Sequence, residues 1–153
     1  MSTTGHAQRS AQPACEELDL DAQLRIAVGR LNRRIRAEKA SDDLSDGQFS
    51  VLAFLFREGP HTVGQLAESE RVTPPSMNRR VNALVAGGYV AREGSPDDGR
   101  KVVVRVTPAG AAFVTETRRR RQQWLGQRTR ELSAAQRETL RQASVIMREL
   151  ADS

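Results

Sequence analysis

One short stretch, residues 73–84, carries the side chains best suited to recognising another molecule. They are Ser76, Asn78, Arg79, Arg80 and Asn82. Arginine can bind guanine through two hydrogen bonds, asparagine can do the same to adenine, and hydroxyl groups bind phosphates or base edges. No acidic residue lies between Thr73 and Leu84, although a solvated helix surface normally mixes acids and bases. This composition favours contact with DNA, and the alternative is a basic surface helix packed on a neighbouring element.

A helix is the element that would position these side chains. Thr73 is a good N-cap, and Pro74 suits the first helical position because its missing N–H is not needed there. Apolar Met77, Val81 and Leu84 recur at i, i+4 and i+7, which predicts one buried face. The opposite face then holds Pro75, Ser76, Asn78, Arg79, Asn82 and Ala83. We expect residues 87–88, both glycine, to end the helix.

The flanking residues predict a helix-turn-helix followed by a hairpin, or wing. Val63, Leu66 and Ala67 mark a shorter preceding helix, with a turn through residues 69–71. Two strands are expected at 89–92 and 101–106, joined by the polar tip EGSPDDGRK. Arg100 at this tip could enter a narrow minor groove, and Asp98 or Asp97 could hold an arginine there through a salt bridge. The alternative is an ordinary solvated hairpin tip.

The run VTPPSMNRRVNALVAGGYVAREGSPDDGRKVVVRVTPAG resembles the winged-helix core of the MarR (multiple-antibiotic-resistance regulator) family. Its wing signature is Asp98-Gly99-Arg100, and Val106-Thr107-Pro108-Ala109-Gly110 starts the next helix. Helix order and length resemble the family over residues 18–150. Two residues depart from the family pattern: Val106 replaces a leucine, and Arg80 stands where the family tends to have an aliphatic residue.

The resemblance implies a mainly α fold with a small β-wing, in which a winged helix-turn-helix core is flanked by N- and C-terminal dimerisation helices. We expect Ser76, Asn78 and Arg79 to read the major groove, with Thr73 and Pro75 at its edge. Arg80 would contact a phosphate or pair with the wing. Arg100 would take the minor groove, and Asp98 would orient it. The family further implies a dimeric repressor of palindromic operators, controlled by a small aromatic or phenolic ligand bound between the dimer region and the winged domain.

The domain organisation follows from the apolar spacing. Residues 1–16 are expected to be a mobile tail, and 17–153 a single MarR-type domain. Within it, the winged helix-turn-helix spans about 45–107, and dimerisation helices span about 18–40 and 108–150. Apolar seams are predicted at Leu24, Val28, Leu31 and Ile35, and at Leu140, Ala143, Met147 and Leu150. A second copy of the chain is the simplest partner for both seams, because helix-turn-helix dimers read palindromes.

Composition narrows the class of protein. A net charge of +5 and a pI near 10.5 favour polyanionic partners. Only 4% of residues are aromatic, which argues against a stacking platform for single strands. With His6 and His61 as the only histidines and no zinc-type spacing, we expect no metal site. We expect no cofactor and no enzymatic activity, because no catalytic motif is present. Apolar runs are too short for a membrane span or signal core, so we expect a cytoplasmic protein.

Several residues leave alternatives open. Cys15 raises the possibility of a thiol-based redox sensor, although Glu16 and Glu17 beside it would raise the pKa of the thiol and make it inert.

His61 or Thr62 is expected near the N-cap of a helix. The arginine run at 118–121 could clamp phosphate, but we expect it to face water or acids on a partner. A winged-helix protein-interaction module that binds no DNA is the remaining class.

Overall fold

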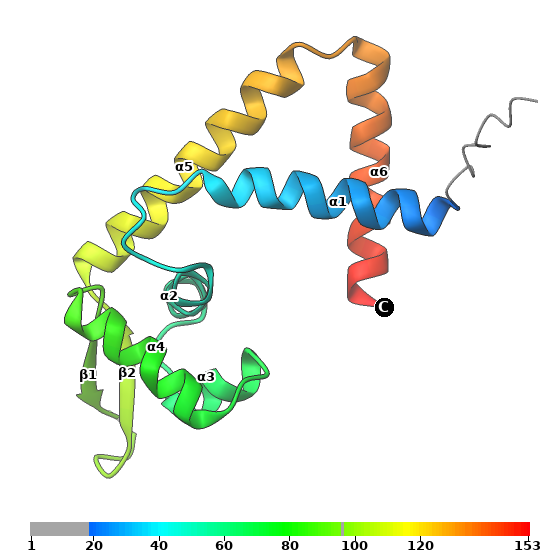
Figure 1. The fold of residues 1–153 in the computed structure, drawn as a ribbon. Helices are drawn as coiled ribbons and strands as arrows, with labels where there is room; N and C mark the ends of the chain where they lie inside the picture. Colours follow the sequence, from blue (N-terminus) through cyan, green and yellow to red (C-terminus); the bar gives the residue numbers. More distant parts are fainter. Residues whose placement is uncertain (1–18, 96) are drawn as a thin grey trace, which may run out of the picture. The chain divides into compact units, whose positions relative to one another are not determined.

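The computed structural model describes residues 19–95 and 97–153 of the chain, which is mainly helical with one two-stranded antiparallel sheet (Figure 1). In chain order the elements are α1 (Leu20–Ala37), α2 (Asp46–Glu58), α3 (Val63–Ser69), α4 (Pro74–Ala86), β1 (Val90–Gly94), β2 (Val102–Val106), α5 (Pro108–Arg130) and α6 (Ala134–Asp152). The chain divides into two compact units between Asn32 and Arg33, inside α1. The predicted fold class is confirmed. The predicted tail, including Cys15, lies outside the described residues.

The core of the second unit joins α2, α3, α4, the sheet and the start of α5. Its fully buried side chains are Val51, Leu52, Leu66, Met77, Val81, Leu84, Val104, Val114 and Thr117. The predicted inner face of the 73–84 helix is among them, because Met77, Val81 and Leu84 are each 0% exposed. Burial of these side chains stabilises α4 on α2 and α3, so the polar side of α4 faces outward.

Capping boxes start three of the helices that the structure describes. Ser45, Thr62 and Ser133 each form a capping box with a glutamine three residues on, which satisfies two backbone N–H groups at once. Thr62, not His61, therefore caps α3. His61 instead forms an isolated antiparallel bridge with Val104 of β2, because its backbone lies beside the strand before the helix begins. Local sequence could not show that bridge, since its partner is 43 residues away.

The turn from α4 into the wing is a glycine-dependent cap. Gly88 has a φ of 76°, in the left-handed region, and its N–H donates to Val85 O. The N–H of Tyr89 donates to Leu84 O, which completes a Schellman motif. The predicted helix stop at residues 87–88 is thus confirmed.

The wing strands pair from Val90↔Val106 to Gly94↔Val102. The first strand lies slightly later than the expected 89–92, because Tyr89 belongs to the helix cap. Thr107 closes the base of the wing: its Oγ1 donates to Gly88 O at 2.6 Å and accepts from the N–H of Gly110 at 3.1 Å. Val103 is 8% exposed although it lies on the opposite face from Val104, whereas Val102 near the tip is 54% exposed.

Helices α1 and α6 each carry an apolar surface that the chain itself leaves open. Within Leu20–Ala37 and Ala134–Asp152, no residue is buried. Val28 and Leu31 of α1 are 44% and 48% exposed, and Ile146 and Leu150 of α6 are 57% and 60% exposed. Across the part of the chain that the structure describes, no helix has both the length and the apolar character needed to cross a bilayer.

Candidate DNA-binding interface

The outward face of α4 carries the predicted contact residues. Of these, Thr73, Pro75, Asn78 and Arg79 are exposed, and Ser76 and Arg80 are partly buried. Thr73 occupies the N-cap position with extended backbone, but its side chain makes no cap hydrogen bond, unlike the capping threonine and serines of α2, α3 and α6. Its hydroxyl is therefore available to a ligand at the N-terminus of α4. Pro74 and Pro75 have no backbone N–H, so any preference for an anion such as phosphate comes there from the helix dipole.

Hydrogen bonds hold two of the predicted base-reading side chains in place. Arg79 Nη2 donates to Ser76 Oγ at 3.1 Å, one helical turn earlier. Arg92 Nη2, from β1, donates to Asn78 Oδ1 at 3.4 Å. Arg92 is exposed and lies next to the polar face of α4, so it adds a cation to the surface. Sequence reasoning missed it, because the wing strand contributes no periodic signal that places Arg92 beside Asn78.

Arg80 differs from its neighbours on α4. Its guanidinium Nη1 lies 3.7 Å from Glu70 Oε2, and the two side chains are only 30% and 20% exposed. The residue pairs with the end of α3, not with the wing.

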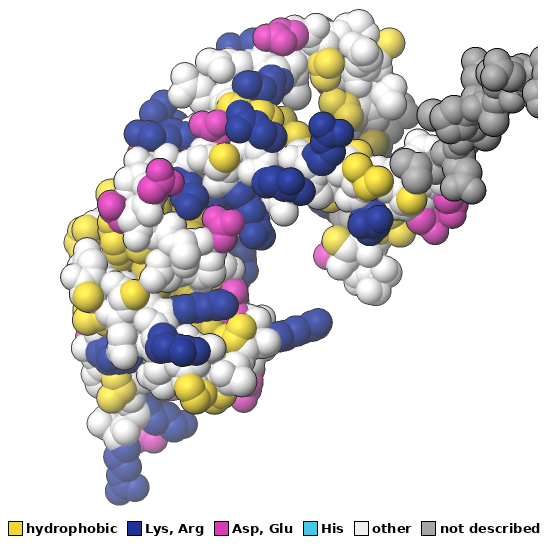
Figure 2. All heavy atoms as spheres, in the orientation of Figure 1, with side chains coloured by type: hydrophobic (Ala, Val, Ile, Leu, Met, Phe, Trp, Pro, Cys, Tyr) yellow, Lys and Arg dark blue, Asp and Glu magenta, His cyan; other side chains and the backbone are white. Residues whose placement is uncertain are grey.

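The wing tip is ordered by Asp98, but through the backbone. Its Oδ1 accepts the N–H of Arg100 at 3.1 Å, and its carbonyl accepts the N–H of Lys101 at 2.9 Å. No ion pair joins the side chains of Asp98 and Arg100 among the described residues, so the expected salt bridge is replaced by a turn that presents Arg100. The Arg100 side chain is exposed. Figure 2 shows Lys and Arg side chains over α4 and at the tip of the wing.

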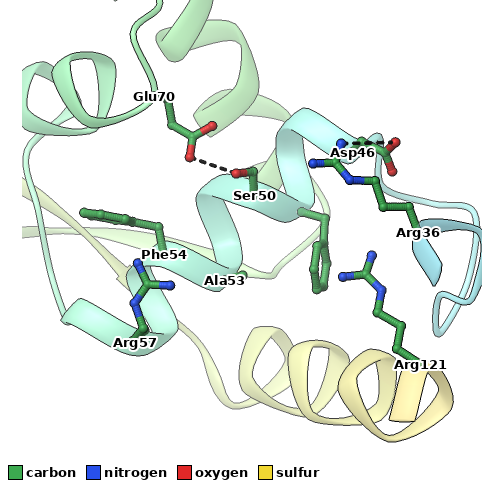
Figure 3. Close-up of a pocket in the computed structure, with 9 residues that line it drawn as sticks. Arg36, Asp46, Ser50, Ala53, Phe54, Arg57, Glu70 and Arg121 are labelled. Atoms are coloured by element: carbon green, nitrogen blue, oxygen red, sulfur yellow. Dashed lines mark hydrogen bonds and ion pairs between the residues drawn. The ribbon is translucent and has the colours of Figure 1, made fainter. Parts of the chain in front are cut away.

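A cavity of about 220 Å³ opens beside α2, within the second unit (Figure 3). Its wall is rich in charged and aromatic side chains. They are Arg36, Asp46, Phe49, Phe54, Arg57, Glu70 and Arg121, with Ser50 and Ala53. Burial lowers the pKa of the Arg121 guanidinium below its ordinary value; nearby Asp46 opposes this shift and Arg36 adds to it. Arg121 also lies over Phe49, with Cζ 4.5 Å from the ring centroid. The wall thus presents partly desolvated positive charge beside aromatic rings. Its residues come from α1, α2, the end of α3 and α5, so sequence spacing did not reveal the arrangement.

The arginine run at 118–121 bonds within its own chain. Arg119 Nε and Arg120 Nε donate to the two oxygens of Glu116 at 2.7 and 2.8 Å. Arg120 and Arg121 also donate to the carbonyl oxygens of Lys39 and Glu38, just after α1. These bonds join α5 to carbonyl oxygens of the segment that follows α1. Arg118, Arg119 and Arg120 are exposed, which agrees with the expectation that the run faces water. The acid that pairs with Arg119 and Arg120 is on their own helix.

Comparison with known proteins agrees with this geometry. A MarR family model matches residues 42–101. An uncharacterized HTH-type transcriptional regulator of Mycobacterium bovis is 43% identical over 139 residues, covering 88% of this chain and 97% of that protein. The multiple antibiotic resistance protein MarR of Salmonella typhimurium is 32% identical over 99 residues, covering 64% and 69%. The HTH-type transcriptional repressor YetL of Bacillus subtilis is 28% identical over 111 residues, covering 71% and 66%.

The fold of this chain also resembles that of a solved MarR structure. The crystal structure of a mutant of MarR from E. coli matches with a TM-score of 0.71 at 25% identity, covering 89% of this chain and 98% of that one. The match spans most of both chains. This chain belongs to the MarR family of DNA-binding transcriptional regulators.

Proposed function

We propose that the protein is a dimeric repressor that binds palindromic operators in double-stranded DNA. The observation that carries this proposal is the outward face of α4, which is free of acidic residues from Thr73 to Leu84. In this proposal Ser76, Asn78 and Arg79 read base edges in the major groove, with Thr73 and Pro75 at its edge. Arg100 enters the minor groove from a tip shaped by Asp98.

The dimer is supported by the apolar side chains of α1 and α6. On α6, Leu140, Val145, Ile146, Met147 and Leu150 are all at least 40% exposed. A surface of this kind along one helix is typical of a protein interface. A second copy with two-fold symmetry would cover it and would place two α4 helices on successive turns of DNA, roughly 34–36 Å apart.

The name of the Bacillus subtilis relative supports repression in preference to activation. A reporter gene placed behind the operator distinguishes repression from activation. A repressor lowers expression of the reporter when the protein is present, and an activator raises it. The two outcomes are mutually exclusive.

We further infer that the cavity beside α2 binds a small aromatic anion that regulates DNA binding. Arg57 and Arg121 would neutralise the charge, and Phe49 and Phe54 would contact the ring. Benzoate and benzyl alcohol serve as matched probes, because they differ in charge and share the ring. The proposal expects benzoate to change operator affinity and Arg121→Gln to abolish that response. An equal effect of benzyl alcohol, or a response that survives Arg121→Gln, would contradict it.

Selection of bound sequences from a random duplex library tests the main proposal. A winged helix that only binds other proteins is the alternative class, and it predicts no enriched sequence and no effect of Arg79→Ala on function. A thiol sensor through Cys15 is a further alternative. It is rejected if Cys15→Ser leaves oxidant-dependent release of DNA unchanged.

A further inference from the structure

Three elements meet at the carboxylate of Glu70, the residue that ends α3. Ser50 Oγ, from α2, donates to Glu70 Oε1 at 2.8 Å. Arg80, from α4, approaches the other oxygen, Oε2, at 3.7 Å. One carboxylate thus contacts a hydroxyl of α2 and a guanidinium of α4, and it is only 20% exposed. A partly buried pair of this kind is screened less by salt than a surface pair.

A second observation places Arg80 tightly against α2. A Cβ built on Gly47 would lie 3.0 Å from Arg80 Cζ, 3.2 Å from Nε and 3.3 Å from Nη1. The guanidinium therefore lies directly on the backbone of the first turn of α2, at a residue without a side chain. Arg80 spans the space between α4 and α2 while its neighbours Asn78 and Arg79 are exposed.

We propose that Arg80 is a positioning residue: its pair with Glu70, fixed by Ser50, sets how α4 sits on α2 and α3 and so how the recognition face meets DNA. This inference rests on the proposed operator binding. It replaces the phosphate contact that the sequence suggested for Arg80. It also joins the interface to the cavity, because Ser50 and Glu70 both line the cavity wall (Figure 3). An occupant that draws Ser50 or Glu70 away would loosen α4.

The direction in which Glu70→Gln changes DNA affinity distinguishes a positioning role from a purely electrostatic one. Glu70 is a negative charge next to the helix that binds DNA. If only its charge mattered, Glu70→Gln would tighten binding to any DNA, because it removes repulsion of phosphates. If Glu70 positions Arg80 and α4, the same substitution weakens binding to the operator.

The experiment measures operator and random-sequence affinity over a range of salt for full-length Glu70→Gln, Arg80→Gln and Gly47→Ala. Glu68→Gln is the matched control, since Glu68 is exposed on α3 and makes no side-chain hydrogen bond or ion pair within the described residues. We expect operator affinity to fall about 3- to 30-fold in Glu70→Gln and Arg80→Gln, which lies within the range for coupled neighbours. Gly47→Ala retains both charges and moves the guanidinium by only a few tenths of an ångström, so it should weaken operator binding less than either charge variant.

Each contrary result has a distinct meaning. Tighter binding by Glu70→Gln, as in Glu68→Gln, overturns the proposal. A fall of about 0.9 in the salt slope for Arg80→Gln alone, with Glu70→Gln unchanged, would assign Arg80 to a phosphate. Unaltered binding by Gly47→Ala would also count against positioning, even if a charge variant failed to fold. If the unsubstituted protein selects no operator, the proposed function fails first, independently of Arg80.

Discussion

Replacing Gly110 with alanine would place a methyl group against the backbone of the residue that leads into the wing. The added Cβ would lie 2.1 Å from Tyr89 O, 3.0 Å from Tyr89 C and 3.0 Å from Val106 Cγ1. Two of these atoms belong to the backbone, which cannot rotate away as a side chain can. An ordinary contact begins near 3.4 Å, so the first turn of α5 and the backbone of Tyr89 must separate by more than an ångström.

Overpacking of this kind costs about 1–3 kcal/mol, and we expect the upper half of that range because the contact is with backbone. For a chain of this length the loss corresponds to a fall in the midpoint of thermal unfolding of roughly 5–12 °C. The matched control is Gly64→Ala, whose Cβ would have Thr62 Oγ1 at 3.9 Å as its nearest neighbour. It should leave stability unchanged or raise it by up to about 1 kcal/mol.

Urea unfolding followed by circular dichroism measures both free energies. If the free energy of unfolding of Gly110→Ala lies within about 0.5 kcal/mol of that of the unsubstituted protein, α5 does not approach the wing as closely as described. Operator affinity is measured as well, at temperatures where Gly110→Ala is folded. The displaced wing should make Gly110→Ala bind the operator more weakly, while the operator affinity of Gly64→Ala should not change.

Three further predictions concern individual charges. Arg79→Ala should cost about 1–3 kcal/mol of specific binding and relax selectivity at one base position, as measured with single-base operator variants; full selectivity would remove Arg79 from the readout. Arg100→Ala should weaken DNA binding, and it should lower the slope of affinity against salt concentration by about 1 if the side chain neutralises a phosphate. An unchanged affinity would show that Arg100 at the wing tip does not contact DNA. Hydrogen bonds from Arg119 and Arg120 lower the pKa of Glu116 from 4.5 to about 2. Because the pKa of Glu116 in the folded protein is below its ordinary value, the stabilisation from this pairing is present above about pH 4.5 and is lost as the pH falls toward 2. NMR of the Glu116 carboxyl should show a titration midpoint that rises in Arg119→Gln. A midpoint near 4.5 in the unsubstituted protein would contradict the pairing.

Local patterns were sufficient to predict α4. Pro74, the apolar repeat of Met77, Val81 and Leu84, and the glycines at 87–88 act within a few residues of one another, and the structure has a helix from Pro74 to Ala86. The same holds for α5, where Thr107 and Pro108 mark the start.

Contacts between distant residues could not be predicted in this way. The pairing of Arg80 with Glu70 could not be predicted from local sequence, because Glu70 lies at the end of another helix and the closeness of Arg80 to Gly47 is visible only in three dimensions. The cavity wall combines Arg36, α2 and Arg121 from well-separated segments. His61 was expected at a helix start, yet its bridge to Val104 depends on where the second wing strand returns.

The most direct test of the central claim is selection of bound sequences from a random duplex library, with the stoichiometry of the complex measured alongside. The account predicts an enriched palindrome whose half-sites lie about one helical turn apart, bound by two chains. Salt-sensitive binding without any enriched sequence, or no binding at low salt, would contradict it.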